Sequence, residues 1–150
     1  TNLYLRDVFG GNDYIAALLL YYGSFGLQDG WTWRVHGTEL DGMKKADLDA
    51  YISFYIEAGS GDEKNPYFAP LNNDLSHGVP ATYICCGELD PLLGDSLALN
   101  AILKQNGVHT EFEIIPGVLH AYMHYGRMMD EAIYCLKKSG EFYASVLKEK

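Results

Sequence analysis

Two short apolar segments with a helical pattern between them constrain the fold of this sequence more than any other feature. Residues 82–85 and residues 111–115 are each typical of a β-strand, and each is followed at once by a loop. Between them, Leu99, Ile102 and Leu103 recur at helical spacing. A strand, helix, strand order makes the two strands parallel, so their carboxyl ends lie at the same edge of a sheet. The sequence therefore predicts an α/β fold.

The loops after these two strands carry two candidate catalytic side chains, Asp90 and His120. An aspartate before a proline is often only a turn former, and a single histidine in a loop is often structural. At the ends of neighbouring parallel strands, however, the two side chains are placed to meet. A carboxylate that orients a neutral imidazole is the part of a hydrolase triad that activates a serine hydroxyl. Asp90 and His120 are therefore the candidate acid and base.

No serine has the sequence context of a hydrolase nucleophile. Ser24 nearly fits the Gly-x-Ser-x-Gly elbow, but a tyrosine replaces the first glycine and no helical pattern follows. Ser96 lies in a Gly-Asp-Ser-Leu block, which in a different lipase class requires an aspartate shortly before the catalytic histidine, and His120 has none there. We therefore interpret Ser24 as a turn residue, and Asp95 with Ser96 as a helix cap.

The three cysteines are Cys85 and Cys86, adjacent in one predicted strand, and Cys135 in a predicted helix. Cys86 could serve as a nucleophile, as in dienelactone-type hydrolases, but it precedes Asp90 so closely that both would compete for one corner of the site. Core packing is the favoured interpretation. An odd number of cysteines without a paired framework suggests reduced thiols and a cytoplasmic setting.

Charge and composition argue against several classes of partner. The net charge is -9 and no run of Lys or Arg occurs, so nucleic acid and anionic membrane surfaces are not expected partners. No apolar run is long enough to cross a membrane. His120 and His124 could hold a metal only from a helix, and the Pro-Gly before His120 favours a loop. We expect no metal and no cofactor.

Other segments complete the predicted fold. Residues 1–9 are typical of the end of a helix, and residues 43–58 have helical spacing. Residues 14–22 are an unbroken apolar run, which predicts a central parallel strand that is buried on both faces. A long amphipathic helix is predicted at the C-terminus, with an apolar face formed by Met129, Ile133, Leu136, Tyr143 and Leu147.

Three aromatic side chains are candidate substrate-binding residues. Trp31 and Trp33 lie in a glycine-rich segment that leaves the predicted sheet, and they are either core anchors or walls of an acyl pocket. Tyr122 follows His120 and either packs or lines the same pocket.

Four motifs occur in order along the chain: Asn-Asn-Asp-Leu at 72–75, Gly-Glu-Leu-Asp-Pro-Leu-Leu at 87–93, Pro-Gly-Val-Leu-His-Ala-Tyr at 116–122 and His-Tyr-Gly-Arg-Met-Met at 124–129. Together they resemble the bacterial acetyl esterases of the hormone-sensitive-lipase family. The resemblance implies an α/β-hydrolase fold, a small acyl ester as substrate, Asp90 as the triad acid and His120 as the triad base.

The oxyanion-hole segment His-Gly-Gly-Gly and the nucleophile segment Gly-Asp-Ser-Ala-Gly of that family do not occur in this sequence. The resemblance implies that residues 1–150 are the C-terminal portion of one α/β-hydrolase domain, with about three parallel strands, flanking helices and a substrate-side helical insertion at residues 24–62. We expect this portion alone to be inactive, and the exposed edge of the strand at 14–22 to permit self-association. The alternative is a non-catalytic α/β binding or regulatory module related to esterases.

Overall fold

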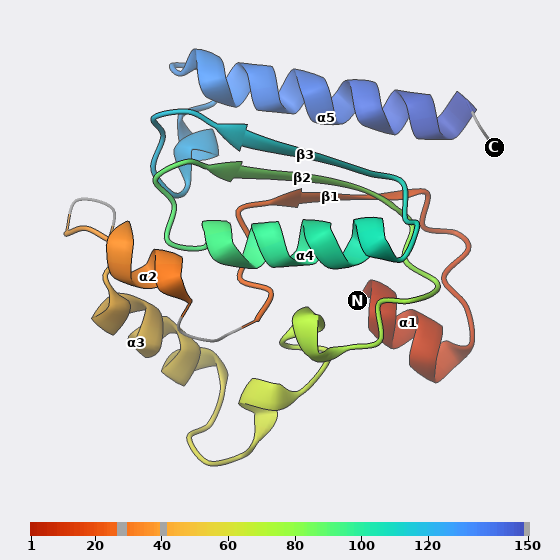
Figure 1. Cartoon of the computed structure of the whole chain (residues 1–150), viewed down its shortest axis with the longest axis horizontal. Helices are drawn as coiled ribbons and strands as arrows, with labels where there is room; N and C mark the ends of the chain where they lie inside the picture. Colours follow the sequence, from red (N-terminus) through yellow and green to blue (C-terminus); the bar gives the residue numbers. More distant parts are fainter. Residues whose placement is uncertain (27–29, 40–41, 149–150) are drawn as a thin grey trace.

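A three-stranded parallel sheet forms the centre of the computed structural model, which describes residues 1–26, 30–39 and 42–148. Figure 1 shows α4 across one face of this sheet and α5 across the other. The predicted α/β fold with three parallel strands is therefore confirmed. The elements in chain order are α1 (Asn2–Phe9), β1 (Ala17–Tyr21), α2 (Trp31–Val35), α3 (Lys45–Tyr55), the 3-10 turns η1 (Asp62–Lys64) and η2 (Pro70–Asn72), β2 (Ala81–Gly87), α4 (Leu93–Gln105), β3 (Thr110–Ile115), the 3-10 turn η3 (Tyr122–Tyr125) and α5 (Asp130–Lys148).

The strand order is β1-β2-β3, so β2 and not β1 is the central strand. Leu19 of β1 is opposite Tyr83 of β2, and Ile84 of β2 is opposite Phe112 of β3. The prediction of a central, fully buried strand at residues 14–22 is therefore wrong in position, and it is wrong in two further respects. The strand is shorter, and its residues are half-buried because, among the described residues, β2 alone pairs with it.

The two faces of β2 pack against different helices because neighbouring strand residues point in opposite directions. Tyr83 and Cys85 pack in one cluster with Phe142 of α5, whereas Ile84 packs in another with Leu99 of α4. Both faces of the central strand are thus covered, as a buried parallel sheet requires.

The C-terminal helix forms as predicted but does not bury the predicted face. Of that stripe, Met129 is half-buried and precedes α5, while the other four side chains are between 41% and 50% exposed. The face that α5 packs on the sheet instead carries both small and large side chains. The buried residues are Ala132, Cys135, Ser139, Phe142 and Val146.

The first turn of α4 also differs from the prediction. The helix begins at Leu93, so Asp95 lies inside the first turn and is not the cap. Its carboxylate accepts hydrogen bonds from the backbone N–H groups of Phe25 (2.7 Å) and Gly26 (2.8 Å) and so fixes the loop after β1. Burial raises the pKa of the Asp95 carboxyl, although these two amide hydrogen bonds oppose that effect.

Helices α2 and α3 lie beyond the carboxyl ends of the strands (Figure 1). They belong to the expected insertion at residues 24–62, of which residues 27–29 and 40–41 lie outside the described residues. Helix α3 is shorter than the predicted 43–58, because the backbone becomes extended at Ile56. Helices α2 and α3 therefore lie next to the loops that follow the strands, where the candidate catalytic side chains are.

Candidate active site

Asp90 and His120 are joined at the carboxyl end of the sheet. Nδ1 of His120 lies 2.8 Å from Oδ2 of Asp90. The other carboxylate oxygen, Oδ1, accepts the backbone N–H of Leu92 at 2.7 Å. Asp90 is completely buried (0% exposed), while the His120 side chain retains contact with solvent. A buried carboxylate with both oxygens engaged holds the imidazole in one orientation.

The two loops that carry this pair are joined by a main-chain hydrogen bond and by a backbone N–H that donates to a side chain. The N–H of Leu89 donates to the carbonyl of Val118 at 3.1 Å, and the N–H of Gly117 donates to Oε2 of Glu88 at 2.9 Å. Gly87 allows this approach, since a Cβ at that position would lie only 2.6 Å from the Val118 carbonyl oxygen. The separation of Asp90 and His120 is therefore set largely by main-chain packing.

Aromatic rings support His120 from the side of β1. The Tyr22 ring meets the His120 ring edge to face at a centroid distance of 4.9 Å, and it meets Tyr122 at 5.7 Å. Tyr22 has a positive φ of 39°, which is uncommon for a bulky residue and directs this ring toward the site. The Tyr122 hydroxyl lies 2.7 Å from Sγ of Cys85. No local sequence signal indicates the role of Tyr22, because its partner lies on a distant loop.

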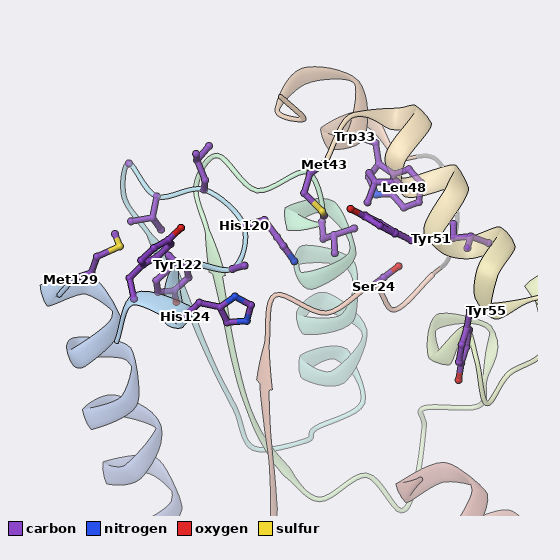
Figure 2. Close-up of a pocket in the computed structure, with 17 residues that line it drawn as sticks. Ser24, Trp33, Met43, Leu48, Tyr51, Tyr55, His120, Tyr122, His124 and Met129 are labelled. Carbon is purple, nitrogen blue, oxygen red and sulfur yellow. The ribbon is translucent and has the colours of Figure 1, made fainter. Parts of the chain in front are cut away.

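A pocket of about 860 Å³ opens beside His120. Figure 2 shows Trp33, Leu48 and Tyr51 projecting into it from α2 and α3, opposite His120. The lining is mainly apolar and aromatic, which suits an uncharged ligand with an apolar part. The insertion side contributes Trp33, Met43, Leu48, Tyr51, Ile52 and Tyr55; Leu92 and Ser24 also line the pocket; the opposite side consists of residues 117–122, His124, Tyr125 and Met129.

The three predicted substrate-binding residues have different positions. Trp33 is only 3% exposed and lines the pocket, and the buried Tyr122 lines it from the His120 side. Trp31 is 61% exposed, is not among the described lining residues, and tilts against His36. Ser24, interpreted from the sequence as a turn residue, lies in a loop and also lines the pocket.

No nucleophile is in place among the described residues, which include every serine and cysteine of the chain. Within this part of the structure no serine hydroxyl forms a hydrogen bond with His120. Ser96 is fully buried in α4. Cys86 is fully buried too, and burial raises the pKa of its thiol, which is the opposite of what a reactive thiolate needs. Cys86 is therefore a core residue.

The described residues contain no group of three or more His, Cys, Asp or Glu side chains that could hold a metal ion. Nor does any helix in residues 1–26, 30–39 or 42–148 combine the length and apolar character that crossing a membrane requires.

Comparisons with known proteins bear on the family and the fold. A family model described as "alpha/beta hydrolase fold" matches residues 2–124. Curated proteins named "Acetyl esterase" from Salmonella paratyphi B and from Salmonella schwarzengrund are each 37% identical over 146 residues. These matches cover 97% of this chain but 45% of each relative, so the chain spans less than half the length of these curated relatives.

Solved structures show the same fold at lower identity. An esterase from Pyrobaculum calidifontis superposes with a TM-score of 0.82 at 19% identity, covering 95% of this chain and 47% of that one. An esterase described as belonging to the bacterial hormone-sensitive lipase family gives a TM-score of 0.80 at 21% identity, with 95% and 46% covered. The resemblance inferred from the four sequence motifs is therefore confirmed.

Proposed function

The chain belongs to the alpha/beta hydrolase fold family, and from this membership we propose that it supplies the acid and the base of a serine carboxylesterase that acts on small acyl esters. The observation that carries the proposal is the 2.8 Å contact between Asp90 Oδ2 and His120 Nδ1 beside an apolar pocket. The curated relatives named "Acetyl esterase" support the reaction class.

The roles follow from the hydrogen bonds. With Oδ2 of Asp90 accepting the Nδ1 proton, Nε2 of His120 is left as the basic nitrogen. It takes the proton of a serine hydroxyl as that oxygen attacks the ester carbonyl, and then returns the proton to the leaving alcohol. Asp90 stabilises the imidazolium that forms on His120. Backbone N–H groups hold the oxyanion of the tetrahedral intermediate.

The serine and the oxyanion-hole groups come, in this proposal, from a segment upstream of residue 1. Two observations support it: the chain spans 45% of the length of its curated relatives, and no described serine is hydrogen-bonded to His120. Residues 24–62 then form the substrate-side insertion, with Trp33 as one pocket wall, and Tyr122 forms part of the opposite wall. The exposed Trp31, expected from the sequence to bind substrate, does not line the pocket. Residues 1–150 alone are expected to be inactive.

Labelling by a fluorophosphonate, which reacts with activated serines, tests the proposal. The longer protein, meaning residues 1–150 together with the proposed upstream segment, should be labelled and should hydrolyse p-nitrophenyl acetate. Residues 1–150 alone should do neither. Hydrolysis by residues 1–150 alone would refute the upstream serine. Hydrolysis by the longer protein that survives His120→Ala would refute the assigned base. The alternative, a non-catalytic binding or regulatory module, predicts no labelling of either form.

Two further expectations remain proposals. The outer edge of β1 has no described partner strand, so copies of residues 1–150 are proposed to associate through it. A monomeric sedimentation profile at tens of micromolar protein, a concentration chosen for the test, would contradict this. A cytoplasmic location is proposed because all three cysteines are free thiols; its check is fractionation of cells that produce the protein.

A further inference from the structure

The side chain of Thr32 connects the pocket wall to the loop of the triad acid, and we propose that Thr32 is a positioning residue for the Asp90–His120 pair. The inference rests on the catalytic roles proposed above for Asp90 and His120. Thr32 lies on α2, far from Asp90 in sequence, and its side chain is completely buried. It touches no reacting atom, so it acts through the backbone around Asp90.

The Thr32 hydroxyl bonds on both sides of the acid loop. Its proton is donated to the carbonyl oxygen of Pro91 at 2.5 Å, and its oxygen accepts the backbone N–H of Gly94 at 3.1 Å. Gly94 lies in the first turn of α4, where backbone N–H groups have no partner within the helix. One buried hydroxyl thus fixes the Pro91–Gly94 turn at two points.

This turn is directly connected to the Asp90 carboxylate. Pro91 follows Asp90 in the chain, and within the same turn the N–H of Leu92 donates to Oδ1 of Asp90. The opposite oxygen, Oδ2, contacts His120. A displacement of the turn therefore rotates or shifts the carboxylate and changes the contact with Nδ1 of His120.

The next residue of α2 extends the connection into the pocket. Trp33 packs in a buried cluster with Leu92, Met43 and Leu48, and it lines the pocket that faces His120 (Figure 2). Helix α2 consequently contributes a hydroxyl to the acid loop and an indole to the wall. The position of the wall and the position of Asp90 are set by the same short helix.

Two substitutions separate the hydroxyl from the shape of the side chain. Thr32→Val keeps the shape but leaves the Pro91 carbonyl and the Gly94 N–H without a partner. Thr32→Ser keeps the hydroxyl. Ser139→Ala is the matched control, because it removes another buried hydroxyl, hydrogen-bonded to Tyr21 at 2.7 Å on the α5 side of the sheet.

The readout is the low-field proton NMR signal of the His120 Nδ1–H, which reports its hydrogen bond to Asp90. Thr32→Val should shift this signal toward that of an exposed histidine or broaden it by exchange with water. Thr32→Ser and Ser139→Ala should leave it in place. An unchanged signal in Thr32→Val, or an equal change in Ser139→Ala, would overturn the inference.

If the Thr32→Val variant does not fold, Gly94→Ala provides a second way to disturb the Thr32 hydroxyl. Alanine favours a helix over glycine, so the fold should persist. Its Cβ, however, would lie 2.9 Å from the Thr32 hydroxyl oxygen and displace it. The same change of the His120 signal is expected, and a signal identical to that of the unsubstituted protein contradicts the inference.

Kinetics of the longer protein give a second readout. Thr32→Val should lower kcat by about tenfold, because small misplacements of a catalytic group are costly. KM should change by less than about twofold, and Thr32→Ser should restore kcat. An unaltered kcat would overturn the inference. If no form hydrolyses esters, the proposed function fails, while the NMR comparison still decides whether Thr32 positions the pair.

Discussion

The two sides of the pocket are built in different ways. On the side of the strand ends, the loops around Asp90 and His120 are held by main-chain contacts such as Leu89 N–H to the Val118 carbonyl. On the insertion side, α2 and α3 are held by side chains, chiefly the buried Trp33. The loops that carry the reacting groups are thus joined to each other mainly through the backbone, with the Thr32 hydroxyl as a side-chain connection to the insertion. The shape of the binding space, by contrast, depends on a few side chains.

Helix α3 shows that few buried side chains attach the insertion side to the rest of the molecule. Its aromatic residues Tyr51, Phe54 and Tyr55 are all more than half exposed, and Leu48 is its one buried residue within Lys45–Tyr55. Side-chain packing of this kind changes with single substitutions, while main-chain hydrogen bonds keep their donors and acceptors at most substituted positions. Substitutions on the two sides should therefore have separable effects on rate and on stability.

The largest expected effect is on rate, from Asp90→Asn in the longer protein. An asparagine cannot hold the Nδ1 proton of His120 as a carboxylate does, so kcat should fall by about 10⁴-fold while the fold persists. Steady-state hydrolysis of p-nitrophenyl acetate measures it. Asp95→Asn is the control, since Asp95 is also buried but bonds the loop after β1. A loss of only a few fold in Asp90→Asn would contradict the role of the acid.

The largest expected effect on stability lies on the insertion side. Trp33→Ala should lower the free energy of unfolding by about 3–5 kcal/mol, because it removes a buried ring and leaves a cavity. Trp31→Ala, at the exposed tryptophan of the same helix, should change it by less than about 0.5 kcal/mol. Urea unfolding of both variants makes the comparison. Equal losses would mean that the two rings are packed alike.

A smaller effect is expected on the side of the strand ends. Glu88→Gln weakens the acceptor of the Gly117 N–H, and the net loss of stability should be about 0.5–1 kcal/mol. Hydrogen exchange at the Gly117 amide should accelerate, because that bond helps to close the His120 loop. The exposed Glu111 on β3 provides the control Glu111→Gln. Unchanged exchange at Gly117 would show that the main-chain contacts alone hold the loop.

The smallest expected effect is a pH dependence of stability that comes from Asp95. Its folded pKa is raised above the unfolded value of 3.8, so the native state binds the proton more tightly than the unfolded state. Its contribution to the free energy of unfolding should therefore decrease as pH rises from 3.8 to the raised folded pKa, and then stay constant. The difference between the unsubstituted protein and Asp95→Asn, measured by urea unfolding, should show this slope. A difference independent of pH would contradict the shift.

The strand-end side was also the more predictable from sequence. Asp90 and His120 each follow a local strand pattern, and parallel strands bring such positions to one edge of a sheet. The residues that contact this pair, including Tyr22, belong to other loops, and no local sequence pattern indicates that they do so. The sequence therefore indicated the two side chains, and the structure was needed for what surrounds them.

The helices show why the remainder could not be predicted. Helix α5 has apolar residues on more than one face, and it buries the face with Ala132 and Cys135 and not the face with Ile133 and Leu136. Trp31 and Trp33 are two residues apart in one short helix, so they point to different sides, and no pattern in five residues shows which side is inward. Which face of α5 is buried and which tryptophan of α2 points inward both depend on neighbours that are distant in sequence.

Gly87 limits which amino acids this chain can accept. A Cβ there would meet two carbonyl oxygens, of Val118 at 2.6 Å and of Leu119 at 3.1 Å, and neither belongs to a side chain that can swing away. By contrast, a Cβ at Gly140 on α5 would meet nothing within 4 Å. If both codons are randomised and the survivors are sequenced after selection for folded protein, codon 87 should return glycine almost alone, while codon 140 should return a broad range of residues.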